Sequence, residues 1–284
     1  MEQNIPTSLV LHFLIILPIL FTFTSQISAQ FSFLNTQCSN TAYTPNSTFG
    51  SNLNQVLNSL STDTQITYGF YNFSAGQQPN RVEATALCRG DVPLATCQDC
   101  VRQSVAGLPA LCPNQKEAFG YSENCVLFYS DASIFGRVLI RPSWTLRNGM
   151  NVSDRSGLNR TLYGLLARLQ NEAASGDSQR KFAAGNVDIG NNGTLYGLVQ
   201  CNPDLTRLEC AQCVQGIMIN FQRYVDTPTF IAGGARTVAP SCNLRYEFFA
   251  FYGGASPSTQ ASLVFDNTSK ILHVSFHFEI SNDL

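Results

Sequence analysis

One cysteine spacing, which occurs twice, limits most strongly how this chain can fold. The triplet C-x8-C-x2-C is formed by Cys88, Cys97 and Cys100. It returns 113 residues later as Cys201, Cys210 and Cys213. A spacing that is kept at a constant offset indicates an internal repeat. We therefore predict two copies of one domain, each built around its own cysteines.

Each copy is expected to contain two amphipathic helices. The first is predicted by apolar residues at i, i+3, i+4 and i+7, which are Leu53, Val56, Leu57 and Leu60 in the first copy and Leu162, Leu165, Leu166 and Leu169 in the second. The second helix is predicted to run through each C-x2-C pair, because these cysteines share a helical face with apolar residues that follow them. The thiols should therefore face the core.

Both copies end in an alternation of apolar and polar residues, which predicts a half-buried strand. In the second copy the outward positions of this strand are Asn243 and Arg245, whereas the first copy has Val126 and Phe128 there. We expect the second copy to cover this apolar face of the first.

The segment 140–149 is predicted to join the copies, since Pro142 and Gly149 interrupt regular structure. Trp144 lies in this segment, and we expect it to be buried between the copies. After the second copy, apolar residues alternate with polar ones over residues 272–280, which predicts one half-buried strand. The sequence leaves the packing partner of that strand open.

Residues 1–29 are predicted to be a secretory signal peptide. An apolar stretch over residues 8–23 is followed by polar and small residues up to Ala29, a pattern suited to cleavage there. His12 and Pro18 interrupt the stretch, and it is shorter than the roughly 20 apolar residues of a spanning helix, so we expect no transmembrane anchor. We expect a secreted, extracellular protein whose cysteines form disulfides.

Six Asn-x-Ser/Thr sequons agree with secretion, and we expect roughly half of them to carry glycan. They stand at Asn46, Asn72, Asn151, Asn159, Asn192 and Asn267. Charged residues make up only 13% of the chain, so glycan can replace part of the missing surface charge.

Charge and composition argue against two classes of function. The 17 Lys and Arg and 19 Asp and Glu leave a formal net charge of -2, without the basic cluster that binds a nucleic acid. The chain has only three histidines, His12, His273 and His277, so a mechanism with an imidazole base has almost nothing to draw on. We assign His273 and His277 no role, and we expect no cofactor and no metal.

Two cysteines of the first copy have no counterpart in the second. The offsets place the missing ones at Arg147 and near Val225, which correspond to Cys38 and Cys112 of the first copy. Because secreted proteins seldom leave odd thiols, we expect Cys38 and Cys112 to be joined, and three pairings then remain for the other four. A metal site or a thioredoxin-type redox pair is disfavoured, because no histidine stands near either C-x2-C and the third cysteine would lack a local partner.

These features resemble the plant cysteine-rich secretory repeat, the ginkbilobin-type domain. The resemblance rests on the doubled triplet, the helix before it and the closing segment GGARTVAPSCNLRYEFFAFY. It places a first domain at 31–137, a second at 142–254 and a C-terminal tail at 255–284. Paired domains of this type occur in plant cysteine-rich repeat secretory proteins, in plasmodesmata-located proteins and in the ectodomains of cysteine-rich receptor-like kinases.

The resemblance implies an α+β fold of two tandem domains, each with two helices packed on a five-stranded antiparallel sheet. It also implies disulfides from the first to the fifth, the second to the third and the fourth to the sixth cysteine. In this sequence the pairs are Cys38–Cys112, Cys88–Cys97, Cys100–Cys125, Cys201–Cys210 and Cys213–Cys242.

The resemblance further implies where a mannose-type sugar would bind, through an Asn, an Arg and a Glu. The first copy has other residue types at these positions, namely Ser39, Phe119 and Ser130. The second copy has all three, namely Asn148, Arg236 and Glu247. An amide, a guanidinium and a carboxylate can together satisfy the hydroxyls of a sugar. The competing interpretation is a structural salt bridge between Arg236 and Glu247 across the sheet.

The sequence favours a non-enzymatic binding module of the plant apoplast, lectin-like or protein-binding, in defence or stress responses. Its expected partners are a carbohydrate or a cell-surface protein. One alternative is a shed or truncated receptor-like kinase ectodomain, because the tail after Gly254 does not resemble the family. Another is a glycosidase that uses Asp91 and Asp204. Each of these stands at the same place in its own copy, which favours a role as turn or helix cap.

Overall fold

The computed structural model describes residues 31–150, 152, 155–190, 193–227, 230–253 and 279–282. The expected signal peptide lies outside the described residues, as do three of the sequon asparagines, Asn151, Asn192 and Asn267. The chain from Phe33 to Leu284 forms one unit, to which both repeats belong.

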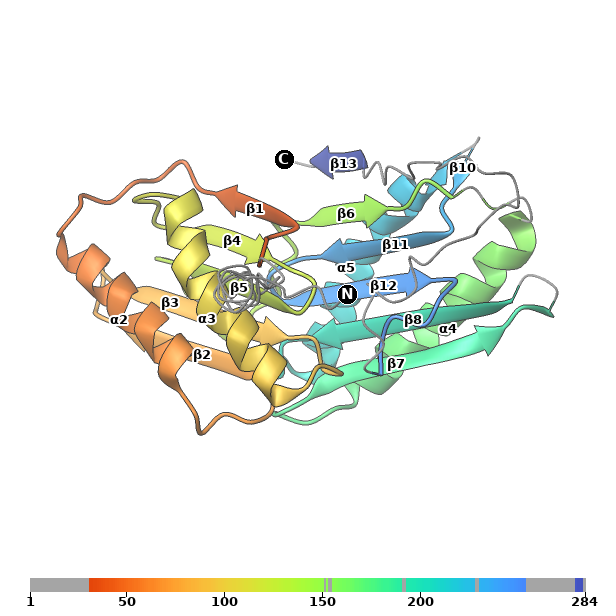
Figure 1. Cartoon of the computed structure of the whole chain (residues 1–284), viewed down its shortest axis with the longest axis horizontal. Helices are drawn as coiled ribbons and strands as arrows, with labels where there is room; N and C mark the ends of the chain where they lie inside the picture. The colour runs from red at the N-terminus through yellow and green to blue at the C-terminus, as the bar shows by residue number, and fades with distance from the viewer. Residues whose placement is uncertain are drawn as a thin grey trace, which may run out of the picture. The chain divides into compact units, whose positions relative to one another are not determined.

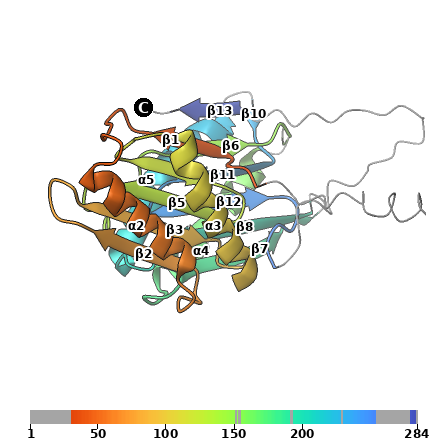
Figure 2. The same cartoon turned by 60° about the vertical axis from the view of Figure 1, so that its left-hand side comes forward.

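The first repeat is a five-stranded antiparallel sheet with two helices on one face (Figure 1). The strands lie in the order β1-β4-β5-β3-β2, and the turned view of Figure 2 shows α2 and α3 side by side across them. The elements follow one another as β1 Asn35–Cys38, α2 Thr48–Thr62, β2 Phe70–Ala75, β3 Val82–Cys88, α3 Leu94–Leu111, β4 Ala118–Tyr121 and β5 Cys125–Ser130.

Both helices of the first repeat form where the apolar spacing predicts them. The N-cap of α2 is Ser47, whose hydroxyl accepts a hydrogen bond from the N–H of Gly50. The four apolar residues of the predicted face of α2 are all buried. In α3 the buried residues include Cys97 and Cys100, so the prediction that the thiols face the core is confirmed.

The second repeat has the same order of elements, and its helices also lie on one face of a sheet. Its elements are β6 Trp144–Arg147, α4 Arg155–Ala174, β7 Lys181–Asp188, β8 Thr194–Cys201, α5 Arg207–Val225, β11 Gly234–Val238 and β12 Cys242–Glu247. A two-stranded ribbon of β9 Asp226–Thr227 and β10 Phe230–Ile231 follows α5. Thr206 and Glu209 form a capping box at the start of α5.

The second sheet has one strand more than the five expected. Its order is β13-β6-β11-β12-β8-β7, and β13, Glu279–Asn282, pairs antiparallel with β6. The strand predicted over residues 272–280 overlaps β13 at Glu279 and Ile280, and its earlier part lies outside the described residues. The tail therefore adds a strand to the edge of the second repeat, because the outer backbone edge of β6 is available for pairing there.

The segment that joins the repeats lies earlier in the chain than the sequence indicated. Residues 140–149 contain β6, which is the first strand of the second sheet and pairs with β11. The connection between β5 and β6 is thus formed by residues 131–143. Its backbone is held at the start by Glu83, which is fully buried and accepts hydrogen bonds from the N–H groups of Ile134 and Phe135.

Five disulfides join the helices to the sheets, in the pairing that the resemblance implied. In each repeat one bridge spans nine residues between a strand end and the following helix, and another joins that helix to the last long strand. Cys38–Cys112 adds a third bridge in the first repeat, with a Cα–Cα distance of 5.3 Å. Each such bridge typically contributes about 2–4 kcal/mol to the free energy of unfolding.

Candidate functional site

The three residues expected to bind a sugar lie on neighbouring strands of the second sheet. Arg236 is in β11, Glu247 is the last residue of β12, and Asn148 directly follows β6. The antiparallel register places Gly234 opposite Glu247 and Arg236 opposite Arg245. The topology thus brings all three backbone positions to one region of the sheet.

Asn148 and Glu247 are in contact at this place. The Asn148 Nδ2 donates to Glu247 Oε2 at 3.3 Å, and Arg245 Nε donates to Glu247 Oε1 at 3.1 Å. A Cβ at Gly234 would collide with both the carboxylate and the amide, so only glycine allows the two side chains to cross the strand here. Burial raises the pKa of Glu247, and the guanidinium of Arg245 opposes that shift.

Arg236 is directed away from Glu247 and toward the first repeat. It donates to Glu123 Oε2 at 3.3 Å and to the backbone oxygen of Ser122 at 3.2 Å, and its guanidinium lies 5.5 Å from the ring centre of Tyr121. The competing interpretation, a salt bridge between Arg236 and Glu247, is therefore wrong. Because the register sets Arg236 opposite Arg245, both guanidinium groups turn to a carboxylate of the other repeat.

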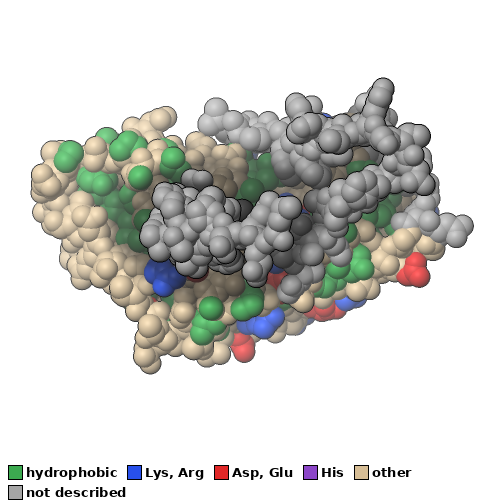
Figure 3. Space-filling model, in the orientation of Figure 1, with side chains coloured by type: hydrophobic (Ala, Val, Ile, Leu, Met, Phe, Trp, Pro, Cys, Tyr) green, Lys and Arg blue, Asp and Glu red, His purple; other side chains and the backbone are tan. Residues whose placement is uncertain are grey.

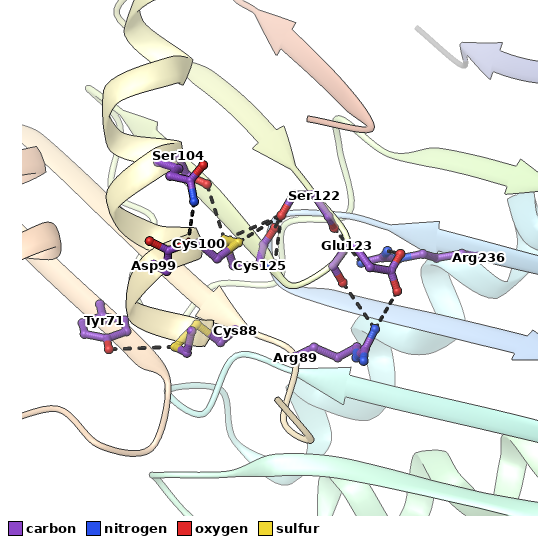
Figure 4. Close-up of a disulfide and its surroundings, with 12 residues drawn as sticks. Tyr71, Cys88, Arg89, Asp99, Cys100, Ser104, Ser122, Glu123, Cys125 and Arg236 are labelled. Carbon is purple, nitrogen blue, oxygen red and sulfur yellow. Dashed lines mark hydrogen bonds and ion pairs between the residues drawn. A yellow bond between two sulfur atoms is a disulfide. The ribbon is translucent and has the colours of Figure 1, made fainter. Parts of the chain in front are cut away.

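Glu123 is the centre of a set of ion pairs that joins the two repeats. Its carboxylate lies 2.6 Å from Arg89, 2.7 Å from Arg245 and 3.3 Å from Arg236 (Figure 4 shows it between Arg89 and Arg236). Arg89 also binds Asp91 through Nε at 2.6 Å. We call the following six residues the Glu123 network: Arg89, Asp91 and Glu123 of the first repeat with Arg236, Arg245 and Glu247 of the second.

The charges of the Glu123 network balance, with three guanidinium groups and three carboxylates. The arginine side chains are only 9–11% exposed, whereas Glu123 is 32% exposed. Burial alone would raise the pKa of Glu123, but the charges of Arg236, Arg245 and Arg89 outweigh it and hold the pKa below its usual value. Burial lowers the pKa of Arg236, and Glu123 opposes this shift. Each of the six side chains is thus paired with at least one group of opposite charge.

An apolar cluster lies beside the Glu123 network and also joins the repeats. Trp144 stacks on Phe119 at a centroid distance of 5.1 Å and an interplanar angle of 4°. The buried members of the cluster are Phe119, Tyr121, Val126, Phe128, Ile134, Trp144, Leu146 and Val238. Two predictions are confirmed: the second repeat covers Val126 and Phe128, and Trp144 is buried between the repeats.

The two carboxylates of the glycosidase hypothesis have separate partners. Asp91 is held by Arg89 of its own repeat. Asp204 Oδ2 accepts a hydrogen bond from the N–H of Gly136, and burial raises the pKa of its carboxyl group. Both lie in turns, as expected, but neither is a helix N-cap, because Pro93 and Thr206 hold those positions.

Where the second repeat lacks a disulfide, an arginine and a tyrosine take its place. Arg147 corresponds to Cys38, and its guanidinium lies 4.9 Å from the ring centre of Tyr224. Arg147 also donates to the backbone oxygen of Tyr224 at 3.4 Å, whereas the Cys38 sulfur lies near the backbone oxygen of Leu111. Val225, which corresponds to Cys112, is fully buried.

Three sequon asparagines fall on described residues. Asn46 and Asn72 are exposed. Asn159 is half-buried in α4, and its amide nitrogen donates to Asp226 at 2.6 Å.

The part of the chain that the structure describes contains neither a helix long and apolar enough to cross a membrane nor a group of three or more His, Cys, Asp and Glu residues suited to a metal ion.

Comparisons with known proteins agree with the doubled fold. The family model described as "Salt stress response/antifungal" matches residues 37–132 and 146–248. Cysteine-rich repeat secretory protein 38 of Arabidopsis thaliana is 37% identical over 222 residues, which are 78% of this chain and 86% of that protein. Cysteine-rich receptor-like protein kinase 8 of the same species is 38% identical over 231 residues, or 80% of this chain. The chain spans about a third of the length of that kinase.

Solved structures show the same fold. The tandem DUF26 ectodomain of the Arabidopsis thaliana cysteine-rich receptor-like protein PDLP8 matches with a TM-score of 0.62 and 22% identity, covering 77% of this chain and 98% of that one. The corresponding ectodomain of PDLP5 matches with a TM-score of 0.60 and 24% identity, covering 77% and 100%. The chain therefore belongs to the salt stress response/antifungal family and carries two tandem copies of its DUF26 domain.

Proposed function

We propose that this protein is a secreted, non-enzymatic binding module that works in the plant apoplast in defence or stress responses. The family description supports this role, and so does the name of cysteine-rich repeat secretory protein 38, a relative that this chain matches over 86% of that protein's length. Five disulfides suit an oxidising compartment outside the cytosol. Its ligand is a carbohydrate or an extracellular protein.

The observation that carries the proposal is the Glu123 network. Its six charged side chains bind one another across the repeats, and together with the apolar cluster they fix the two repeats as one body. Functional side chains work best when a rigid scaffold positions them. The carboxylates of the network are paired with arginines. Such paired carboxylates suit a rigid scaffold for binding better than they suit the acid and the base of a glycosidase.

Mannose-type binding through Asn148, Arg236 and Glu247 stays a prediction. The contact between Asn148 and Glu247 supports it, because an amide and a carboxylate already lie together. Arg236 would have to exchange Glu123 and Ser122 for sugar hydroxyls, which separates the repeats at this point.

A glycan array and a panel of extracellular receptor domains, both screened with the protein secreted from plant cells, test the proposed function. We expect saturable binding to at least one sugar or protein, competed by untagged protein. Hydrolysis of an arrayed glycan, abolished in Asp91→Asn or Asp204→Asn protein that remains folded, would instead establish a glycosidase.

Three variants test the mannose-type site. If these residues bind mannose, Asn148→Ala and Arg236→Gln each weaken the binding about tenfold, as expected for lost hydrogen bonds to a ligand. Glu123→Gln is the matched control, because it disturbs the Glu123 network without changing the three residues. Equal loss in all three variants would show that the repeat junction, and not a mannose contact, is affected.

A shed or truncated receptor ectodomain is the alternative proposal. The similarity to receptor-like kinase 8 over 80% of this chain supports it. Sequencing the 3′ end of the transcript decides between the two, since a receptor transcript continues into a membrane span and a kinase.

A further inference from the structure

A cavity of about 190 Å³ opens where the first repeat meets the start of β7. Its wall is formed by the loop before β2, the turn between β3 and α3, and the first turns of α3, all of the first repeat. The second repeat contributes Arg180, which directly precedes β7. The docking of the two repeats therefore brings Arg180 to a cavity that the first repeat otherwise forms.

The wall of this cavity is held in place by close packing. Gly69 has a φ of +81° and lies against the Cys88–Cys97 disulfide, which also lines the cavity. A Cβ at Gly90 would come within 2.5 Å of the ring of Phe182, so glycine is required for the close approach of the repeats here. A preformed wall lowers the entropic cost of binding a ligand.

The cavity carries a net positive charge. Its lining contains two arginines and, among the described residues, no carboxylate. Arg89 is neutralised by Asp91 and Glu123. Arg180 is exposed and forms no ion pair within the described part of the chain, and its guanidinium lies over the ring of Phe182 at 5.0 Å from the centroid.

Two large apolar side chains of the lining are exposed. Tyr68 is 41% exposed and Leu94 is 37% exposed. Figure 3 shows hydrophobic and basic side chains next to one another on the face of the molecule that contains the start of α3. An exposed aromatic ring beside an unpaired guanidinium suits a ligand with one flat, weakly polar face and one anionic group.

We propose that this cavity binds a carboxylate-bearing sugar, with Arg180 pairing with the carboxylate and Tyr68 packing on the sugar ring. The proposal rests on the proposed binding function and names the place and the ligand class for it. A guanidinium presents parallel N–H donors that match a carboxylate. The volume is below the roughly 300 Å³ at which pockets for drug-sized ligands begin, so it admits one sugar residue of a longer chain.

A sugar fits this place better than an acidic peptide does. Specific protein partners bury about 800 Å² on each side around an apolar centre. Here the lining has two exposed large apolar side chains, Tyr68 and Leu94, beside the half-buried Val92. The small polar cavity therefore favours recognition of a single ring with its charged group.

The test is titration calorimetry of the whole secreted protein with trigalacturonic acid. Its fully methyl-esterified form retains the rings and removes the charge, and a blocked tripeptide with a central Glu offers a carboxylate without a sugar. Arg180→Gln and Tyr68→Ala probe the two contacts. Arg207→Gln is the matched control, because Arg207 is an exposed arginine of the second repeat outside the cavity lining.

We expect trigalacturonic acid to bind, and Arg180→Gln to weaken it about tenfold or more, as for a lost charged hydrogen bond. Arg207→Gln should leave the affinity unchanged, and thermal unfolding should show that all variants are folded. Equal binding of the methyl ester, preference for the peptide, or full affinity in Arg180→Gln would each overturn the proposal. If the protein binds other sugars or proteins on the array but not trigalacturonic acid, this site is refuted and the binding function stands.

Discussion

Asp204 of the second repeat accepts a hydrogen bond at 2.9 Å from the backbone N–H of Gly136, which follows the last strand of the first repeat. The arrangement is reciprocal, since Asp91 of the first repeat accepts one at 3.2 Å from Gly253, which follows β12. Both glycines have a positive φ, 61° and 78°. Each repeat thus holds the chain that leaves the other.

Replacement of Asp204 is predicted to change how stability depends on pH. Burial raises the pKa of this carboxyl group, and Oδ1 has no hydrogen-bond partner among the described residues. The folded state therefore holds the proton more tightly than the unfolded state, whose pKa is about 3.9, and the wild type loses stability as the pH rises above about 4. Asp204→Asn does not titrate. In thermal unfolding at pH 3, 5 and 7, the melting temperature of the wild type should fall relative to that of this variant as the pH rises. A difference in melting temperature that does not change with pH would contradict the prediction.

Replacement of Glu123 is predicted to change the pH dependence of stability in the opposite direction. The arginines hold the pKa of Glu123 below its usual value despite its burial. Its contribution to stability is therefore present above the unfolded-state pKa of about 4.3 and is lost as the pH falls through the folded-state pKa. In the same pH series the melting temperature of the wild type should rise relative to that of Glu123→Gln as the pH increases. A gain for Glu123→Gln at neutral pH would mean that the network does not stabilise the junction.

A sixth disulfide is predicted to form at the place where the second repeat lacks one. Arg147 and Val225 correspond to Cys38 and Cys112, whose Cα atoms are 5.3 Å apart. The double variant Arg147→Cys with Val225→Cys should form a bridge that adds up to about 4.5 kcal/mol, the loop-entropy value for a loop of this length. Peptide mapping without reduction detects the bridge, and thermal unfolding measures its effect. The single variant Arg147→Cys is the control, and two free thiols in the double variant would refute the structural equivalence.

Glycan occupancy is predicted to differ among the sequons. Asn46 and Asn72 are exposed and should carry glycan in protein secreted from plant cells. Asn159 is half-buried and its amide nitrogen is bonded to Asp226, so it should remain unmodified once the chain has folded. Mass spectrometry after enzymatic deglycosylation in heavy-oxygen water reads each site separately. Full occupancy at Asn159 would show that this asparagine is modified before α4 packs.

Local patterns in the sequence predicted the helices, the apolar face of the first sheet that the second repeat covers, and the disulfide that the second repeat lacks. Leu53 and Leu162 occupy the same place on equivalent helices because helix formation depends on a spacing that can be read directly. The apolar residues Val126 and Phe128, at the outward positions of their strand, indicated a covering partner, because the second copy has polar residues at the equivalent positions. Arg147 could be placed because Leu162 lies 109 residues after Leu53, and the same offset leads from Cys38 to Arg147.

The Glu123 network could not be predicted in this way. Glu123 stands in the turn between β4 and β5, and its partners Arg89, Arg236 and Arg245 come from two repeats. Which charges meet depends on how the sheets dock, and this is decided by packing between residues far apart in the sequence. The position of Arg180 at the cavity has the same origin, because only docking brings it to the Cys88–Cys97 disulfide.

Trp144 is the only tryptophan of the chain, and it lies stacked on Phe119 between the repeats. Its indole emission therefore reports on the junction, and the parting of the two repeats should change it. If they separate while the disulfides keep each repeat intact, the emission should move to longer wavelength before the far-ultraviolet circular dichroism changes. The intrinsic fluorescence of the unlabelled protein thus distinguishes opening of the junction from unfolding of the domains.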